Sequence, residues 1–315
     1  MVKLRNVSGR HPSLVGDPRY ESVALANPTN EYRCLKKNRW LYTSLIDFVA
    51  HICLKDLEPS LSFNHQNVTI ANTLFIENCK VLVEKYSENA NDKSVKHAQD
   101  YMKQFRKGKH ILIIPLVSKG HFYTMVVEVN FNEYKKTTNE FAIYQSIKIY
   151  DSLYNDRRTN VRAATGVGKT FRALHEYLAV VVLGVQPKRN IEAALRVSSY
   201  SPCPTQENDY DCGLFSLGVV FHLYLTGTCT STCFNQQHVS KIRMLLAIGL
   251  KDNFDSTELG ECVLALFPKL LDELDLPIVK FSDEELDNDN SSGLSSPAST
   301  ISTSNNDNSN RDMEI

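Results

Sequence analysis

Several features are scarce in this 315-residue chain, and each scarcity excludes a class of protein. No apolar run approaches the roughly 18 residues that cross a bilayer, so we expect no membrane protein. Residues 1–18 lack the apolar core of a secretory signal, and we therefore expect a protein of the cell interior. The eight cysteines are too few to staple a chain of this length and are expected to be reduced thiols.

Net charge is equally scarce, because 35 Lys+Arg face 36 Asp+Glu and leave a formal charge of −1. The charge is unevenly spread: residues 283–315 hold eight acids and one base, a net −7, which leaves +6 on residues 1–282. A mildly basic body falls short of what a dedicated nucleic-acid binder carries. We therefore expect neither nucleic acid nor a membrane among the partners.

Composition divides the chain into three parts. Residues 1–32 are polar and rich in Gly and Pro, which predicts a flexible N-terminal arm, and residues 33–275 carry the periodic apolar patterns of a folded domain. Residues 276–315 become Ser-, Asn- and Asp-rich from Phe281 on, which predicts a disordered acidic tail. The apolar stretch 276–281, followed by acids, is similar to a SUMO-interacting motif, but we favour a last strand or linker of the domain itself.

Apolar periodicity within residues 33–275 predicts an α+β domain. Helices are predicted from 40 to 54 and over 93–107, 170–184, 212–225, 236–250 and 258–275. Strands are predicted over 110–117, 121–130 and 141–150, with 132–140 as a hairpin connection. Residues 70–76 are ambiguous between loop and strand, and 193–200 fit a short strand or a helix end. Because residues 212–225 are apolar all round, they predict a helix buried at the centre of the domain.

Cys212 stands apart from the other cysteines because it lies between a polar loop and this apolar helix. A thiol in the first turn of a helix meets the positive end of the helix dipole, which favours the nucleophilic thiolate. Asp211 is expected to cap the helix, and Gly213 is expected to let a substrate backbone come close. The pattern predicts a reactive cysteine.

A thiolate nucleophile needs a base that a third group orients. His121 begins one predicted strand, and Asp151 follows the next. If these strands pair antiparallel, Asp151 can hold one ring nitrogen of His121 while the other nitrogen faces Cys212. Gln206, six residues before Cys212, can supply an oxyanion donor together with the Cys212 backbone N–H. Each residue alone has an ordinary structural explanation, but together they favour an active site.

These residues resemble the motifs of the ubiquitin-like-protein proteases, the SUMO-specific peptidase family. The segments that carry the resemblance are Thr205–Phe215 with its Asp-Cys-Gly, Gly120-His121-Phe122, Ile149–Leu153 with its Tyr-Asp-Ser, the Trp-Leu pair at Trp40, and Asn72–Ile76. They follow the family order from about Lys36 to Gly227. The Asp-Cys-Gly segment is the most specific of them.

The resemblance implies a papain-like cysteine protease fold, in which a central mixed sheet is flanked by helices and the triad order is His, Asp, Cys. It implies a thiol peptidase or isopeptidase that cleaves after the Gly-Gly tail of a ubiquitin-like modifier, SUMO-like first, in the nucleus or cytoplasm. Trp40 and Phe122 would line the approach of that tail. We expect a monomer that needs no metal or organic cofactor. Tyr42 and Thr43 stand where the family has Asn-Asp, so ubiquitin or another Gly-Gly modifier stays open.

Two other motifs were weighed against simpler explanations. Residues 163–170 are similar to a phosphate-binding loop, but they lack its first Gly and the core strand before it, so we interpret them as a helix start. Cys229, Cys233 and His238 lack a fourth ligand and a Cys-x2-Cys knuckle, which favours loop cysteines over a metal site. The alternative functions are a catalytically weak modifier-binding module of the same fold, a mobile-element protease with an unrelated substrate, and, third, a nucleotide switch through Lys169.

Overall fold

The computed structural model describes residues 32–54, 67–102, 108–118, 120–153, 167–188, 191, 198–264 and 266–267. Its strands are β1 (Val68–Ile70), β2 (Lys109–Ser118), β3 (His121–Asn130), β4 (Tyr144–Tyr150) and β5 (Ser198–Tyr200). Its helices are α2 (Thr43–Phe48), α4 (Phe75–Glu88), α5 (Lys93–Met102), α6 (Phe131–Thr137), α8 (Val167–Tyr177), α10 (Cys212–Thr226), α11 (Gln236–Asp252) and α12 (Ser256–Leu264). Turns of π-helix, η2 (Val49–Cys53) and η5 (Leu178–Leu183), extend α2 and α8, and a 3-10 turn, η4 (Glu140–Ile143), precedes β4. Among these described residues, no helix is long and apolar enough to cross a membrane.

The five strands form one mixed sheet in the order β1-β2-β3-β4-β5. The central pairs β2–β3 and β3–β4 are antiparallel, whereas the short outer strands β1 and β5 pair in parallel with their neighbours. Strands β2, β3 and β4 are rich in Ile, Val and Tyr, which suit a pleated surface covered on both sides. The α+β architecture and the central mixed sheet flanked by helices are confirmed.

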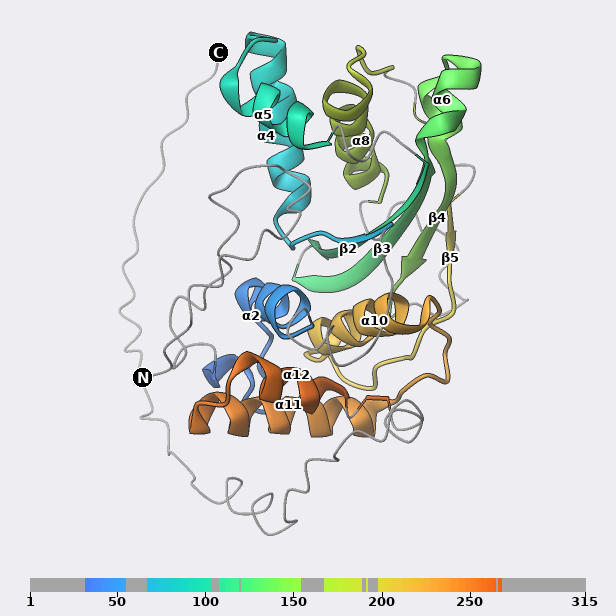
Figure 1. Ribbon diagram of the computed structural model, residues 1–315. Coiled ribbons are helices and arrows are strands. Elements are labelled where there is room, and N and C mark those ends of the chain that lie inside the picture. The colour runs from blue at the N-terminus through green and yellow to red at the C-terminus, as the bar shows by residue number, and fades with distance from the viewer. Residues whose placement is uncertain are drawn as a thin grey trace, which may run out of the picture. The chain divides into compact units, whose positions relative to one another are not determined.

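Side-chain alternation along the strands divides the core into two clusters on opposite faces of the sheet. On β3, Phe122 and Val126 join the cluster that also contains α10, whereas Tyr123 and Met125 join the cluster that also contains α4 and α8. Figure 1 shows these layers, with α10, α11 and α12 on one side of the strands and α4, α5 and α8 on the other. The period of two in a strand therefore builds a core on each face.

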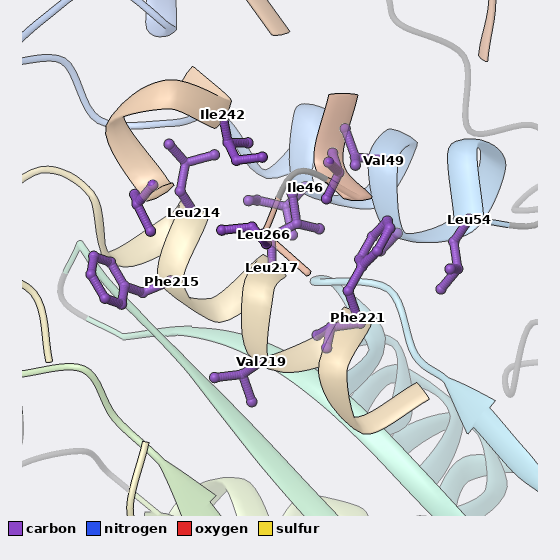
Figure 2. Close-up of a cluster of buried hydrophobic side chains, with 14 of the residues drawn as sticks. Ile46, Val49, Leu54, Leu214, Phe215, Leu217, Val219, Phe221, Ile242 and Leu266 are labelled. Atoms are coloured by element: carbon purple, nitrogen blue, oxygen red, sulfur yellow. The ribbon is translucent and has the colours of Figure 1, made fainter. Parts of the chain in front are cut away.

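Helix α10 is buried on nearly every side, as its uniformly apolar sequence predicts. Phe122 and Val126 of β3 belong to the same cluster as α10, and the Thr124 hydroxyl lies 2.8 Å from the Ser216 hydroxyl. Figure 2 shows the helix-facing side of the same cluster, where side chains of α10 meet Ile46, Ile242 and Leu266 from other segments. The sheet and the neighbouring helices thus fix the place of α10, and with it Cys212 at its first residue.

Several predicted elements lie where the sequence placed them, and two were wrong or missed. The predicted 132–140 connection is not a bare hairpin, because α6 occupies 131–137 and η4 begins at Glu140. Helix α4 was not predicted at all: the ambiguous 70–76 stretch contains the end of β1 and the start of α4. The predicted arm 1–32, apart from Tyr32, and the tail 276–315 lie outside the described residues.

The central position of α10 predicts a large cost for opening a cavity inside it. Phe221 is fully buried, so Phe221→Ala should lower the free energy of unfolding by about 3–5 kcal/mol. Val81 is an apolar helix residue that is 47% exposed, and Val81→Ala should change stability by less than about 0.5 kcal/mol. Urea unfolding followed by circular dichroism compares the two variants, and equal losses would contradict the assigned core.

Candidate active site

The antiparallel pairing of β3 with β4 brings His121 and Asp151 together at one edge of the sheet. Tyr150, the last residue of β4, pairs with Thr124, three residues after the start of β3. Asp151 follows directly, and its Oδ1 lies 2.7 Å from Nε2 of His121. The backbone N–H of Leu153 donates to the same carboxylate at 3.0 Å, which holds it in place. With Nε2 facing Asp151, Nδ1 is the ring nitrogen left for another partner.

That other partner is Cys212, whose side chain interacts with His121 and raises the pKa of the imidazole. Cys212 is the first residue of α10 and is only 3% exposed, whereas the His121 side chain is 23% exposed and Asp151 only 8%. Three side chains that are far apart in the sequence thus come together, with the imidazole interacting with both the carboxylate and the thiol. This arrangement can polarise the thiol and carry its proton.

The two partners of His121 change its proton affinity. Burial acts to lower the pKa of His121, but hydrogen bonds and charge from Asp151 and Cys212 outweigh burial and raise it from 6.5 to about 9. The imidazole therefore keeps its proton at neutral pH. Because the folded pKa is raised, the stability that this pair contributes is complete below pH 6.5 and is lost as the pH rises through about 9.

Asp211 does not cap α10 as the sequence predicted. It occupies the N-cap position, but its side chain makes no capping hydrogen bond. The carboxylate turns to Arg243 of α11 instead, with Oδ1 lying 2.7 Å from Nε and 2.6 Å from Nη2. A buried guanidinium with a matched fork of donors is a stronger partner for the carboxylate than one backbone N–H.

Gln206 lies in the loop before α10 and is 5% exposed. Its Oε1 accepts a 2.6 Å hydrogen bond from the Ser152 hydroxyl, and its backbone N–H donates to the Ser152 carbonyl at 3.0 Å. Its Nε2 donates to the Asn208 carbonyl. Since a primary amide has two N–H bonds, one donor remains beyond that contact. Ser152 therefore couples Gln206 to the residue next to Asp151.

Trp40 and Phe122, the two predicted aromatic residues, lie in different environments. Trp40 is 53% exposed, and its ring covers Gly120, where an added Cβ would lie only 2.2 Å from the indole. Gly120 also has φ +77°, so both its backbone and this contact require glycine. Trp40 thus lies beside His121 at the surface, whereas Phe122 is 4% exposed within the core cluster of α10.

The space beside Gly213 is filled by other side chains of the protein. A Cβ at Gly213 would lie 3.1 Å from Leu41 and 3.4 Å from Ile46. The prediction that Gly213 makes room for a substrate backbone was therefore wrong at this Cβ position. Glycine there permits α10 to pack closely against the segment that begins α2.

Arg243 and Ser152 contact residues of the site but were not predicted from the sequence. Arg243 occupies an apolar stripe of α11, between Val239, Ile242 and Leu246, all of which are buried. A lone Arg at a core position is a signal for a buried partner, and it could have been found from the spacing alone. Ser152 gives no such signal, because its partner Gln206 is 54 residues away in the chain.

The two remaining motifs have structural roles where they are described. Val167 begins α8, in line with a helix start there, and residues 163–166 lie outside the described part of the chain. His238 accepts the backbone N–H of Asn235 through Nδ1 in the capping box of α11. Within the described ranges, no group of three or more His, Cys, Asp or Glu side chains could hold a metal ion.

Comparison with known protein families shows to which family the chain belongs. Residues 39–256 match the Ulp1 protease family, C-terminal catalytic domain. The match covers more than half of the chain and includes His121, Asp151, Gln206 and Cys212. The domain is therefore that of a cysteine protease. The chain is a member of the Ulp1 protease family, whose members process or deconjugate ubiquitin-like modifiers.

A search of curated proteins finds no match, and the solved structures named next are distant likenesses. A SUMO protease Ulp1 with its catalytic cysteine oxidised to a sulfinic acid is 15% identical, with 85% of this chain and 91% of that chain covered and a TM-score of 0.38. The Ulp1-like SUMO protease catalytic domain of Chaetomium thermophilum is 15% identical, with 77% and 92% covered and a TM-score of 0.41. The Xanthomonas campestris effector XopD, bound to ubiquitin, is 14% identical, with 72% and 89% covered and a TM-score of 0.29.

The raised pKa of His121 gives a spectroscopic prediction. In a protein with 15N-labelled histidine, the His121 ring should titrate near pH 9, and Asp151→Asn should move the midpoint down because a hydrogen bond and a charge are lost. Cys212→Ser should move it in the same direction. Asp209→Asn, which removes an exposed acid from the loop before α10, should leave the midpoint in place. A His121 midpoint near 6.5 in the unmodified protein would contradict this three-residue arrangement.

Proposed function

We propose that this chain is a thiol isopeptidase or endopeptidase that cleaves after the Gly-Gly tail of a ubiquitin-like modifier. The observation that carries the proposal is the 2.7 Å contact between His121 and Asp151, with Cys212 on the other side of the imidazole. Cys212 is the nucleophile, His121 the acid and base, and Asp151 the group that orients His121. Membership of the Ulp1 protease family supports this class of reaction.

The reaction follows from the protonation states. The Cys212 sulfur attacks the glycine carbonyl carbon, and the carbonyl electron pair moves to oxygen as the tetrahedral intermediate forms. Gln206 and the Cys212 backbone N–H stabilise that oxyanion. His121 then gives its proton to the amine as the C–N bond breaks, which leaves a thioester. Water attacks the thioester while His121 accepts its proton, and the C–S bond breaks with its electron pair on sulfur. The Cys212 thiolate and protonated His121 are thus restored, and the modifier is released with a free carboxylate.

The surface beside His121 supports a tail of two glycines. Trp40 offers a flat, exposed ring directly against Gly120, so an extended chain without side chains can pass close to the imidazole. Phe122 is buried in the core cluster that contains α10, and from there it supports β3 behind this approach. A residue with a large side chain at either substrate position would meet the ring of Trp40. We therefore expect the protease to be specific for substrates with a Gly-Gly tail.

A SUMO-like modifier is the first choice of substrate, in the nucleus or cytoplasm, and family membership is what supports both. Thr43 begins α2 where the family has an acid, and Tyr42 before it is 49% exposed. Contact with the modifier at this point is consequently apolar and neutral. Ubiquitin or another Gly-Gly modifier is the alternative that a direct comparison decides.

Labelling by modifier-derived probes tests the nucleophile. Propargyl probes built on SUMO, ubiquitin and NEDD-type modifiers should form a covalent adduct with the unmodified chain for at least one modifier. Cys212→Ala should abolish that adduct, because it removes the thiol that interacts with His121. Cys233→Ala removes a thiol that is only partly buried and should label normally. Equal labelling of the unmodified chain and Cys212→Ala by every probe would refute the proposal.

The oxyanion role of Gln206 predicts a loss that is confined to acyl transfer. Gln206→Ala should lower kcat on a fluorogenic amide of the preferred modifier by about 10²–10³-fold, as the loss of one oxyanion donor does elsewhere. Alkylation of Cys212 by iodoacetamide has no tetrahedral oxyanion and should change little. Thr205→Ala, which truncates an exposed side chain next to Gln206 in the same loop, is the matched control. If both reactions slowed equally, Gln206 would instead be acting on the thiol.

A further inference from the structure

Arg243 is the most highly connected buried charge in the described chain. It lies on α11 with its side chain 8% exposed, and its Nε and Nη2 bind Oδ1 of Asp211 at 2.7 and 2.6 Å. Nη1 donates to the carbonyls of Cys34 and Lys36 at 3.0 and 3.4 Å, and Nη2 donates to the Tyr210 carbonyl at 3.2 Å. One guanidinium therefore joins three separate segments of the chain.

The carboxylate that Arg243 binds is the residue directly before the proposed nucleophile. Asp211 is 1% exposed, and its Oδ2 accepts hydrogen bonds from Asn208 at 2.7 Å and from Gln236 at 2.6 Å. The carboxylate thus has partners on both oxygens. Because it makes no cap to α10, its bonds fix the loop on one side of Cys212 and not the helix backbone.

The charge of Asp211 makes these contacts relevant to chemistry. An anion beside a thiol disfavours the thiolate, and a buried anion acts more strongly than an exposed one. Arg243 supplies the opposite charge at 2.6 Å and offsets this effect. Stability alone explains the pair poorly, because apolar residues at such positions often stabilise a fold as well as a buried ion pair does.

We propose that Arg243 is a positioning residue for Cys212: through Asp211 it fixes the loop that begins α10 and offsets the negative charge of the residue next to Cys212. The proposal rests on Cys212 being the nucleophile, as argued above. Arg243 acts on the site through the groups that it binds, first of all Asp211 and the Tyr210 carbonyl. By binding the carbonyls at 34 and 36, it also anchors the segment that leads to Trp40.

The other charged groups around Cys212 are constant in the proposed test. His121 faces the thiol from β3, and Asp151 acts through His121. From the helices packed against α10, α2 contributes Asp47, which hydrogen-bonds to Thr73, and η2 contributes His51. None of these residues is altered, so a change in pH dependence reports on the Asp211–Arg243 pair.

The test measures the rate of Cys212 alkylation by iodoacetamide from pH 5 to 10, with the modified peptide quantified by mass spectrometry in the full chain. Arg243→Gln leaves Asp211 uncompensated and should move the half-maximal pH upward, which slows alkylation at pH 7 by about three- to tenfold. Asp211→Asn leaves the cation and should move it downward. The double variant should return toward the original half-maximal pH.

Controls separate charge from folding. Lys241→Gln removes an exposed positive charge from the same helix, and Leu246→Ala weakens the packing of that helix without changing its charge. Both should leave the pH profile unchanged. Arg243→Lys should keep the profile but lower the plateau rate, because an ammonium cannot reproduce the fork of contacts. Opposite shifts in Arg243→Gln and Asp211→Asn would support the proposal.

Unchanged profiles in both single variants would overturn it, and so would identical shifts in both. If Arg243→Gln fails to fold, Asp211→Asn and Arg243→Lys decide: no downward shift in Asp211→Asn overturns the proposal. Failure of the proposed function is distinguishable, since it would appear as an unmodified chain that no modifier probe labels, whatever the alkylation profiles are.

Discussion

The burial of α10 on nearly all sides is the constraint on which the rest of this structure depends. An all-apolar helix has no face to give to water, so the sheet must cover one side while α2, α11 and α12 cover the other. Once α10 is fixed in this way, Cys212 at its first residue lies beside the start of β3, where His121 is. The reactive arrangement is thus a result of packing at the core, and few local interactions are needed to hold the thiol itself.

The sequence predicted the central part of this arrangement because its signals were local and strong. The apolar, β-branched runs in 110–117 and 121–130 and the uniform apolarity of 212–225 indicated the strands and the helix. An antiparallel pair was then enough to bring His121 to Asp151. Helix α4 was missed because its apolar stripe is short and interrupted by Glu and Lys. The connection after β3 was misjudged because a polar run can form a helix as readily as a turn when Asn130 caps it.

What the sequence could not predict was the choice among competing partners. Asp before a helix is usually a cap, and only tertiary structure brings Arg243 close enough to outcompete the backbone. In the same way, Gly213 next to a reactive cysteine suggested room for a ligand, but Leu41 and Ile46 fill that room. Both errors come from contacts that join segments far apart in the chain. Ser152 and its bond to Gln206 belong to the same class.

The long reach of Arg243 has a consequence for how the enzyme comes into being. Arg243 joins Cys34 and Tyr210 to α11, so residues separated by 209 positions must meet before these contacts are complete. During synthesis the chain emerges from its N-terminus, and a nascent polypeptide that ends soon after Cys212 has His121, Asp151 and Cys212 but not yet Arg243. The contacts of Arg243 with Asp211, Tyr210 and the carbonyls at 34 and 36 therefore form only after α11 has left the ribosome.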